Sequence, residues 1–422
     1  MSRLRVQNNT DVISRRHRPD VQIFLYMGLL MLLGLVIMFA IGPQRANVLN
    51  AAFGADYGDT YFFLRQLLSI VLALGAFTAA ALIPYKTLLN YPRFIFFAGV
   101  AACLFLALAD IAGLGIAQES YGATRWFNLG MFGFQPSEVL KFGVLIYIAA
   151  FLGARIKSGE INSWQETLIP MGIMLAVAAV LIVVVQRDLG TGVSMFAIVF
   201  AMLFMSGMSY RLLGIIAGIV VAAGVLLIAT APHRVERVMT FIQGDNTSVS
   251  DAEGYHIEQA KIAIGTGGWT GVGIGNSVQA TGYLPEAIND SVFAIMGETF
   301  GFLGLVATIV LFVALFMRLL KVMDHLAEYR LKLLVAGVFG WLAAHTILNI
   351  GAMTGLIPLT GITLPLLSFG GTSMLFVAAA LGLVFQLSRY TVHGSKLKEA
   401  DYEDSGSRRR VGRSRYTSSR ST

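Results

Sequence analysis

One acidic side chain, Asp290, stands where a long polar stretch meets the apolar run from Ser291 to Phe316. A carboxylate in such a place can act as a general base that accepts a proton from a hydroxyl group. The order Asn289-Asp290-Ser291 before an apolar run is also typical of a helix N-cap. The two interpretations differ in chemistry, because asparagine caps a helix as well as aspartate does but cannot take the proton. The sequence alone supports both interpretations.

A charged pair, Glu138 and Lys141, lies three residues apart inside another apolar run. This spacing places both side chains on one face of a helix, where they can form an ion pair. Charges within a membrane span are costly and normally face a polar cavity or a partner. We therefore regard the pair as a candidate for a substrate cavity, with a structural ion pair that holds two helices in register as the alternative.

Three arginines, Arg125, Arg234 and Arg237, could bind a phosphate or pyrophosphate group bidentately. Each of them alone would also fit contact with lipid head groups. Asp188 directly follows Arg187, and it either pairs with that neighbour or points into the same cavity.

These residues belong to a chain of 422 residues that is 56% hydrophobic and only 13% charged, with a mean hydropathy of +0.71. Soluble domains carry about 25% charged residues, so this chain cannot bury its apolar surface in a soluble core. It is an integral membrane protein. The single cysteine, Cys103, excludes an intramolecular disulfide, and the six histidines show no metal-ligand spacing, which argues against a zinc site.

Apolar runs of roughly 17 to 25 residues predict an all-α polytopic membrane protein with about ten transmembrane helices. The predicted spans are Val21 to Ile41, Leu64 to Ile83, Phe94 to Ile111, Ser137 to Gly153, Leu168 to Val185, Gly190 to Met205, Leu212 to Ala231, Ser291 to Phe316, Leu331 to Met353 and Thr372 to Leu387. Most lysines and arginines fall on one side if both chain ends are cytoplasmic, as the retention of positive charge in cytoplasmic loops requires. An even number of spans fits this orientation.

The spans divide the chain into a cytoplasmic N-terminal segment (1–20), a transmembrane domain (21–388) and a basic, disordered cytoplasmic tail (389–422). A pI of 9.5 could suit nucleic acid, but in this setting the positive charge favours contact with anionic membrane lipids and no nucleic acid. The long segment 232–290 between the seventh and eighth spans is expected outside the cytoplasm. Its stretch Tyr255 to Ile264 is amphipathic and could lie along the interface as a helix.

Two glycine-rich segments flank the predicted chemistry. Gly265 to Gly275 fits neither nucleotide-binding glycine motif, so we interpret it as flexible or re-entrant backbone at the membrane surface. Gly355 to Ser373 is uncharged and contains two prolines. Such a segment breaks helices and exposes backbone polar groups, so at membrane depth it must line a cavity or pack on protein. We expect it to form a wall of the Asp290 site.

Several motifs, taken in order, resemble the SEDS family of bacterial cell-wall polymerases, which comprises FtsW, RodA and SpoVE. The motifs are Ala123-Thr-Arg-Trp-Phe-Asn-Leu-Gly130, Gln135-Pro-Ser-Glu-Val-Leu-Lys141, Asp188-Leu-Gly-Thr191, Gly275-Asn-Ser277, Tyr283-Leu-Pro-Glu-Ala287 with Asp290, and Gly361-Ile-Thr-Leu-Pro365 with Ser368-Phe-Gly-Gly371. They cover nearly the whole chain. Within the family, Thr363 and the long basic tail favour the FtsW branch.

The resemblance implies a ten-span glycosyltransferase that polymerises lipid II, a disaccharide-peptide linked to undecaprenyl pyrophosphate, on the outer face of the cytoplasmic membrane at the division septum. It implies Asp290 as the essential aspartate and a class B penicillin-binding protein and other division proteins as partners. The positions assigned to the substrate or its cavity are Arg125, Glu138, Lys141, Asp188, Arg234, Arg237, Glu286 and Ser368.

The chain departs from the family pattern around the aspartate. Ile288-Asn289 stands where His-Thr is common, and Ser291-Val292 stands where Phe-Ile is common. Arg187 replaces a proline and Ala280 replaces a frequent lysine. Asp290 itself is kept, which indicates a divergent member rather than an inactive one.

The expected chemistry is attack by a sugar hydroxyl on the anomeric carbon of a lipid-linked sugar, with the pyrophosphate leaving. One base, Asp290, without a nucleophile implies inversion. A divalent cation, Mg²⁺ or Mn²⁺, held by Asp290 and the pyrophosphate could share the work, although one carboxylate gives little support for a metal site. The alternatives are a lipid II flippase, a RodA-like elongation polymerase and a non-catalytic division scaffold.

Overall fold

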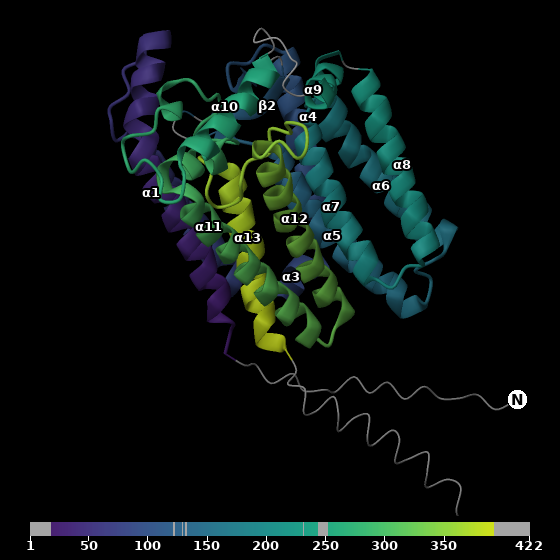
Figure 1. Cartoon of the computed structure of the whole chain (residues 1–422). Coiled ribbons are helices and arrows are strands. Elements are labelled where there is room, and N and C mark those ends of the chain that lie inside the picture. Colours follow the sequence, from purple (N-terminus) through teal and green to yellow (C-terminus); the bar gives the residue numbers. More distant parts are fainter. Residues whose placement is uncertain are drawn as a thin grey trace, which may run out of the picture.

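The structure, a computed structural model, describes residues 18–120, 123–128, 130, 133–230, 232–243 and 252–391. The predicted N-terminal segment 1–20 and basic tail 389–422 lie almost entirely outside this part of the chain. The described residues form a bundle of long helices, as the all-α prediction requires (Figure 1).

Helices occupy all ten predicted spans. Within the described residues nine are long and apolar enough to cross a membrane, and a shorter apolar helix, α7, supplies the tenth. They are α1 (Val21–Phe53), α2 (Tyr61–Leu82), α4 (Pro92–Ile111), α5 (Pro136–Ser158), a composite helix (Trp164–Val185), α7 (Leu189–Met205), α8 (Tyr210–Ala229), α11 (Val292–His325), α12 (Tyr329–Met353) and α13 (Thr372–Leu387). The composite consists of α6 (Ile169–Ala179) between two π-helical turns, η1 (Trp164–Leu168) and η2 (Val180–Val185).

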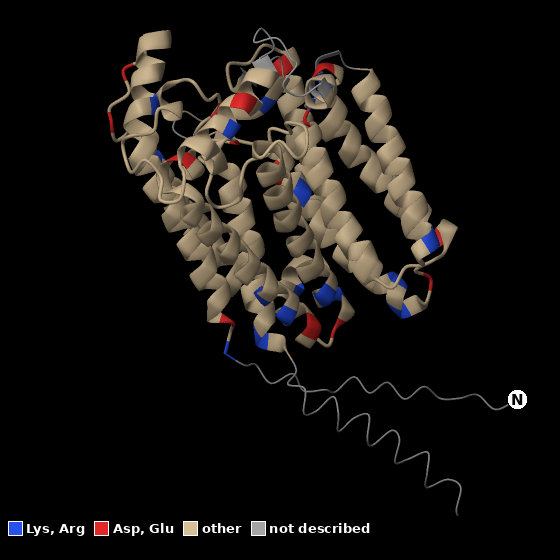
Figure 2. Cartoon of the chain, in the orientation of Figure 1, with Lys and Arg blue, Asp and Glu red and all other residues tan. Residues whose placement is uncertain are grey.

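The two ends of the described chain meet at one end of the bundle, which we call the terminal end. There the Asp20 backbone N–H donates to Ser388 Oγ at 2.8 Å, and the Asp20 carboxylate pairs with Arg318. Lysines and arginines gather at this end (Figure 2). The opposite, loop end carries α9 (Pro232–Gln243), α10 (Ala252–Thr266) and a small sheet (Figure 1). An even number of crossings is therefore confirmed between Asp20 and Ser388.

The sheet was not predicted from the sequence. Its strands β1 (Ala117–Ser120), β2 (Ala123–Asn128) and β3 (Gly133–Phe134) are antiparallel and follow the order β1-β2-β3. They fill the connection between α4 and α5, and β2 contacts both helices. The sheet thus fixes Arg125, which lies on β2, at the loop end.

Glycines allow the helices to approach closely. A Cβ atom on Gly99 of α4 would collide with Leu140 of α5, and one on Gly382 of α13 would collide with the Phe77 backbone of α2. Small residues at such crossings let helices gain van der Waals contact inside a membrane, where the hydrophobic effect does not drive their association. A short helix, α3 (Tyr85–Asn90), joins α2 to α4.

Helix α11 is broken at Gly301, where φ is 67° and ψ is −167°, a conformation that is essentially restricted to glycine. The loop after α10 provides hydrogen bonds on both sides of the break. These are Val272 N–H to Glu298 O at 2.9 Å, Gly273 N–H to Thr299 O at 3.1 Å, Phe302 N–H to Gly268 O at 2.8 Å and Leu303 N–H to Trp269 O at 3.2 Å. Of the two alternatives for Gly265 to Gly275, these hydrogen bonds contradict freely flexible backbone, and re-entrant backbone at the membrane surface stays a prediction.

The part of α11 before the break is enclosed on every side. All residues from Val292 to Thr299 are buried, including the carboxylate of Glu298. That carboxylate accepts hydrogen bonds from Ser277 Oγ and from the Val278 N–H, the latter at 2.9 Å. Asp290 thus lies just before a helix segment that is anchored in the protein interior.

Candidate functional site

The loop that carries Asp290 is a compact turn. The N–H groups of Asn289 and Ser291 donate to the Glu286 carbonyl oxygen at 2.9 and 3.2 Å. Glu286 has a positive φ of 48°, and its carboxylate accepts a hydrogen bond from the Asn289 side chain. Glu286, a predicted substrate contact, therefore shapes the turn in which Asp290 lies.

Asp290 is not the N-cap of α11. The helix begins at Val292, Ser291 occupies the N-cap position, and no side-chain hydrogen bond closes this cap among the described residues. The Ser291 hydroxyl instead donates to the Pro285 carbonyl oxygen at 2.8 Å. The capping interpretation of Asp290 is therefore wrong, and its action as a general base stays a prediction.

Two further elements hold the Asp290 turn. Asn349 of α12 donates through Nδ2 to the carbonyl oxygens of Asp290 and Ile362, both at 2.7 Å. The Phe369 N–H donates to the Ile288 carbonyl oxygen at 2.8 Å. Ile362 and Phe369 both belong to the uncharged segment Gly355 to Ser373, so the expected packing of this segment against the Asp290 loop is confirmed.

Asp188 caps a helix. Its carboxylate accepts hydrogen bonds from the Thr191 N–H at 2.9 Å, from Thr191 Oγ1 at 2.8 Å and from Gln135 Nε2 at 3.1 Å, and it is the N-cap of α7. The following Gly190 lies so close to Ile362 that a Cβ atom would be 2.9 Å from its Cγ1. Asp188 therefore borders the same uncharged segment, in a capping role that the sequence did not suggest.

Arg125 holds the turn that precedes α7. Its Nε donates to the Gln186 carbonyl oxygen at 3.2 Å, and its Nη2 donates to the Arg187 carbonyl oxygen at 2.8 Å. Arg187 has a positive φ of 52°, which is uncommon for a residue with a side chain. Arg125 thus stabilises an unusual backbone turn, and phosphate binding by its guanidinium stays a prediction.

Glu138 and Lys141 form the predicted ion pair. Lys141 Nζ lies 2.8 Å from Glu138 Oε1, and the two side chains are 0% and 4% exposed. Nζ also lies 4.7 Å from the centre of the Trp341 ring of α12, an arrangement that stabilises the cation. The ion pair lies within α5, and the contact of Lys141 with the Trp341 ring joins α5 to α12. This enclosed position fits the alternative of a structural ion pair, and a role in a substrate cavity stays a prediction.

Helix α12 links this ion pair to the Asp290 turn. The His345 ring lies 6.5 Å from the Trp341 ring, which Lys141 contacts, while Asn349 binds the carbonyl groups of Ile362 and Asp290. His345 and Asn349 are four residues apart and therefore share a helix face. Sequence reasoning missed both, although polar residues inside an apolar span are a signal of function or packing.

The three remaining predicted site residues are Arg234, Arg237 and Ser368. Arg234 of α9 donates to the Leu227 carbonyl oxygen near the end of α8 at 3.2 Å. Arg237 is in α9 as well, but its side chain lies outside the described residues. Ser368 Oγ accepts a hydrogen bond from the Leu364 N–H at 2.8 Å. Substrate contact by these three residues stays a prediction.

The predicted amphipathic helix Tyr255 to Ile264 falls within α10. The expected helix is therefore present. It packs on α11, with Ala260 and Ala263 fully buried, and its position along the membrane interface stays a prediction. Nε2 of His256, on the same helix, lies 2.6 Å from Ser291 Oγ. His256 is a second residue near Asp290 that the sequence analysis missed, because the spacing of 35 residues carries no signal.

Metal ligands do not cluster in the part of the chain that the structure describes. No three side chains of histidine, cysteine, aspartate or glutamate converge there. Hard divalent cations such as Mg²⁺ need several oxygen ligands. The described residues around Asp290 therefore do not by themselves fit a divalent cation.

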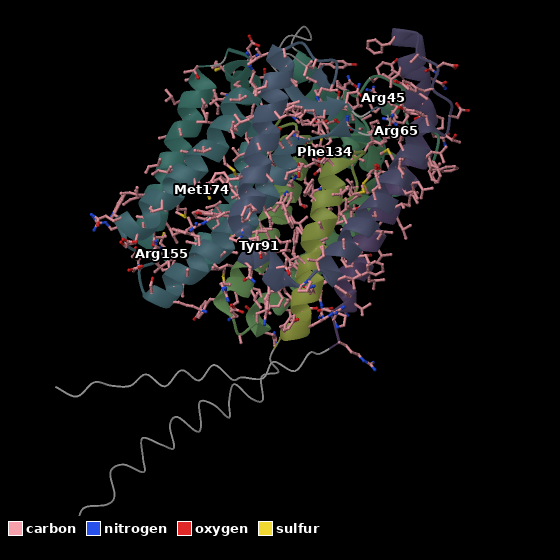
Figure 3. All side chains as sticks on the ribbon, turned by 180° about the vertical axis from the view of Figure 1, so that it is seen from behind. Arg45, Arg65, Tyr91, Phe134, Arg155 and Met174 are labelled. Atoms are coloured by element: carbon pink, nitrogen blue, oxygen red, sulfur yellow. The ribbon has the colours of Figure 1, made fainter. Side chains whose placement is uncertain are left out.

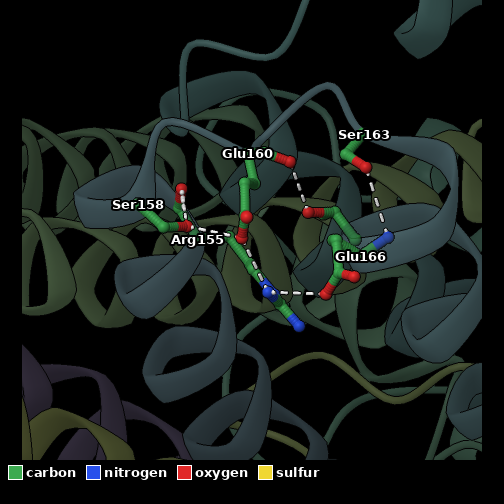
Figure 4. A network of polar contacts seen from close by, with 6 residues as sticks. Arg155, Ser158, Glu160, Ser163 and Glu166 are labelled. Atoms are coloured by element: carbon green, nitrogen blue, oxygen red, sulfur yellow. Dashed lines mark hydrogen bonds and ion pairs between the residues drawn. The ribbon is translucent and has the colours of Figure 1, made fainter.

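Another polar cluster lies at the terminal end, away from Asp290. Arg155 Nη1 pairs with Glu160 and Glu166 at 2.8 and 3.1 Å, and Ser158 Oγ donates to Glu160 at 2.8 Å (Figure 4). The Ser158 hydroxyl, followed by Arg155, lowers the pKa of Glu160. Figure 3 shows Arg155 near the terminal end and Arg45 and Arg65 near the loop end. Exposed ion pairs contribute little stability. The cluster joins the last turn of α5 to Glu160 in the connection and to Glu166 of η1.

Comparison with known proteins gives the family. The model of the FtsW, RodA and SpoVE family, described as a cell cycle protein, matches residues 20–393. A probable peptidoglycan glycosyltransferase FtsW of Polynucleobacter necessarius is 32% identical over 87% of this chain and 86% of its own length. The stage V sporulation protein E of Bacillus subtilis is 31% identical over 90% of this chain and 99% of its own length.

Solved structures show the same architecture. A chain from work on the structural coordination of polymerization and crosslinking by a peptidoglycan synthase complex has a TM-score of 0.69 and 25% identity, and the match covers 89% of this chain and 99% of that one. The Rod shape determining protein RodA of Thermus thermophilus has a TM-score of 0.62 at 23% identity, with 89% and 98% covered, and supports the fold alone. The chain therefore belongs to the FtsW, RodA and SpoVE family, the SEDS family, and is most like FtsW.

Proposed function

We propose that this protein is a peptidoglycan glycosyltransferase that polymerises lipid II into glycan strands during septal wall synthesis. Relatives named probable peptidoglycan glycosyltransferase FtsW in Polynucleobacter necessarius and Methylococcus capsulatus support this, at 32% and 37% identity. The observation that carries the proposal is the placement of Asp290. Its turn is fixed from α12 by Asn349 and from the uncharged segment by Phe369, as a positioned base requires.

In the proposed mechanism Asp290 accepts the proton of the sugar hydroxyl that attacks the anomeric carbon of a lipid-linked sugar. The new glycosidic bond forms as the bond to undecaprenyl pyrophosphate breaks, and the pyrophosphate leaves as an anion. A single base without a nucleophile inverts the anomeric centre. Arg125, Arg234 and Arg237, all in loop-end elements, are the cations that we propose to offset the charge of the leaving group. We assign no step to a metal ion.

The orientation follows from the charges. Lysines and arginines gather at the terminal end (Figure 2), and cytoplasmic segments retain positive charge. We infer that both chain ends are cytoplasmic and that Asp290 faces the outer side of the bacterial cytoplasmic membrane. The similar chain from the peptidoglycan synthase complex supports a partner that carries out cross-linking, which we propose is a class B penicillin-binding protein.

The decisive experiment is polymerisation of purified lipid II by the full-length protein in nanodiscs, with and without the penicillin-binding partner. Wild type should make glycan strands, whereas Asp290→Asn should make none and should unfold at the wild-type temperature. Asp56→Asn, an exposed carboxylate in the α1–α2 connection, is the matched control and should remain active. If the protein were instead a lipid II flippase, the Asp290→Asn variant would still move lipid II across the membrane, and the wild-type protein would form no polymer. Equal polymer from wild type and Asp290→Asn, or none from wild type with its partner, would overturn the proposal.

A further inference from the structure

We propose that His256 is a positioning residue for Asp290 and acts through Ser291. The inference rests on the proposed function and deepens it, because it names the group that orients the base. His256 Nε2 lies 2.6 Å from Ser291 Oγ, and Ser291 directly follows Asp290 in the chain.

The proton in this contact comes from the imidazole. A serine hydroxyl carries one proton, and Ser291 donates it to the Pro285 carbonyl oxygen at 2.8 Å. A carbonyl oxygen can only accept, so Ser291 Oγ must accept from His256, whose Nε2 therefore carries a proton. Both the neutral Nε2–H tautomer and the imidazolium provide this donor. The contact needs an N–H group rather than a charge.

The same geometry excludes a serine nucleophile. In a nucleophilic pair the serine proton points at the histidine, which takes it as the bond forms. Here the Ser291 proton points at Pro285, and Ser291 is 0% exposed, so no substrate can reach its hydroxyl. The contact between His256 and Ser291 therefore positions the backbone and performs no chemistry of its own.

Helix α10 provides a firm support for His256. His256, Ala260 and Ala263 share one face of α10, and Gly267, which directly follows the helix, continues the same spacing. Ala260 and Ala263 are 0% exposed, and a Cβ atom on Gly267 would collide with the Gly297 carbonyl oxygen of α11. This face is closely packed against α11, so the backbone of α10 that carries His256 is held in place.

Two side chains thus fix the backbone around Asp290. Asn349 donates a hydrogen bond to the carbonyl group of Asp290 itself at 2.7 Å. His256 donates to the hydroxyl group of the next residue, Ser291. Together they set the direction in which the Asp290 carboxylate leaves the chain. Ser291 is one of the positions at which this chain departs from the family pattern, so the contact belongs to this chain's own version of the turn.

The test is a double-mutant cycle in lipid II polymerisation at varied lipid II concentration, with the full-length protein and its partner. His256→Leu and Ser291→Ala should each lower kcat about five- to tenfold, the effect of one hydrogen bond, and leave KM unchanged. The double variant should lose no more than either single variant. His256→Gln, whose Nε2 amide keeps a donor, should retain most of the activity. Glu258→Gln, on the exposed side of α10, should match wild type.

Hydrogen–deuterium exchange of the 286–291 amides separates this inference from the proposed function. Exchange should speed up in His256→Leu and stay slow in His256→Gln, whether or not any polymer forms. The inference is overturned if His256→Leu changes neither kcat nor exchange, if the glutamine variant fails as badly as the leucine variant, or if the two single losses add in the double variant. Failure of wild type to polymerise lipid II would overturn the function, and exchange would still decide the role of His256.

Discussion

Replacement of Asn349 by leucine should destabilise the protein and slow glycan synthesis, because this side chain holds two buried carbonyl groups. Its Nδ2 donates to the carbonyl oxygens of Asp290 and Ile362, both at 2.7 Å, and the residue is 1% exposed. Leucine is similar in size but has no donor, so both carbonyl groups would lose a partner. An unsatisfied buried polar group costs about 1–3 kcal/mol, which gives a total of about 2–6 kcal/mol.

The rate should fall because the Asp290 turn loses its attachment to α12. If about 1.4 kcal/mol of the cost appears in the transition state, kcat falls about tenfold. Thermal unfolding in nanodiscs and lipid II polymerisation measure the two effects separately. Thr346→Val is the matched control, because the Thr346 hydroxyl donates only within its own helix, to the Leu342 carbonyl oxygen at 2.9 Å. A wild-type unfolding temperature and rate for Asn349→Leu would refute the reasoning.

Three further predictions concern other contacts. Glu138→Gln or Lys141→Met should each destabilise the protein by about 3–5 kcal/mol, since one buried charge is left unpaired, and the double variant should recover most of the loss in thermal unfolding. A double variant no more stable than the single ones would contradict this. Asp188→Ala should cost about 1–2 kcal/mol by removing the N-cap of α7, and Asp188→Asn should cost less; equal losses in unfolding would count against a capping role. The pKa of Glu160 is lowered from its ordinary value of 4.5, first of all by the hydrogen bond from Ser158. The contacts of the Glu160 carboxylate therefore stabilise the fold at pH 7, and this stabilisation is lost as the pH falls through the lowered pKa. The small difference in unfolding temperature between wild type and Glu160→Gln should thus vanish in acid, and a difference that grows there would disprove it.

The membrane helices could be predicted because a bilayer imposes a length and a composition on each span. The pairing of Glu138 with Lys141 could also be predicted, since residues three apart on a helix are neighbours by geometry. The packing of the Gly355 to Ser373 segment followed from the need of its backbone groups for partners. All three inferences depend on local rules, and all three hold in the structure.

Contacts between distant residues could not be predicted. Asn349 meets Asp290 across 59 residues, and Arg125 meets Arg187 across 62. Periodicity tells which face of a helix is apolar but not which neighbour it meets. Even the local cap rule failed at Asp290, because the Ser291 hydroxyl donates back to Pro285 and the helix begins one residue later than the rule expects.

The break in α11 at Gly301 determines which parts of the protein can tilt together. The loop 268–273 is bonded to carbonyl groups before the break and to N–H groups after it, so bending at Gly301 would stretch bonds on one side. The membrane-crossing part of α11 and the short segment that follows Asp290 therefore behave as one stiff rod. A protein that bound to the terminal end of α11 and tilted it would, through this connection, change the orientation of the Asp290 carboxylate at the loop end.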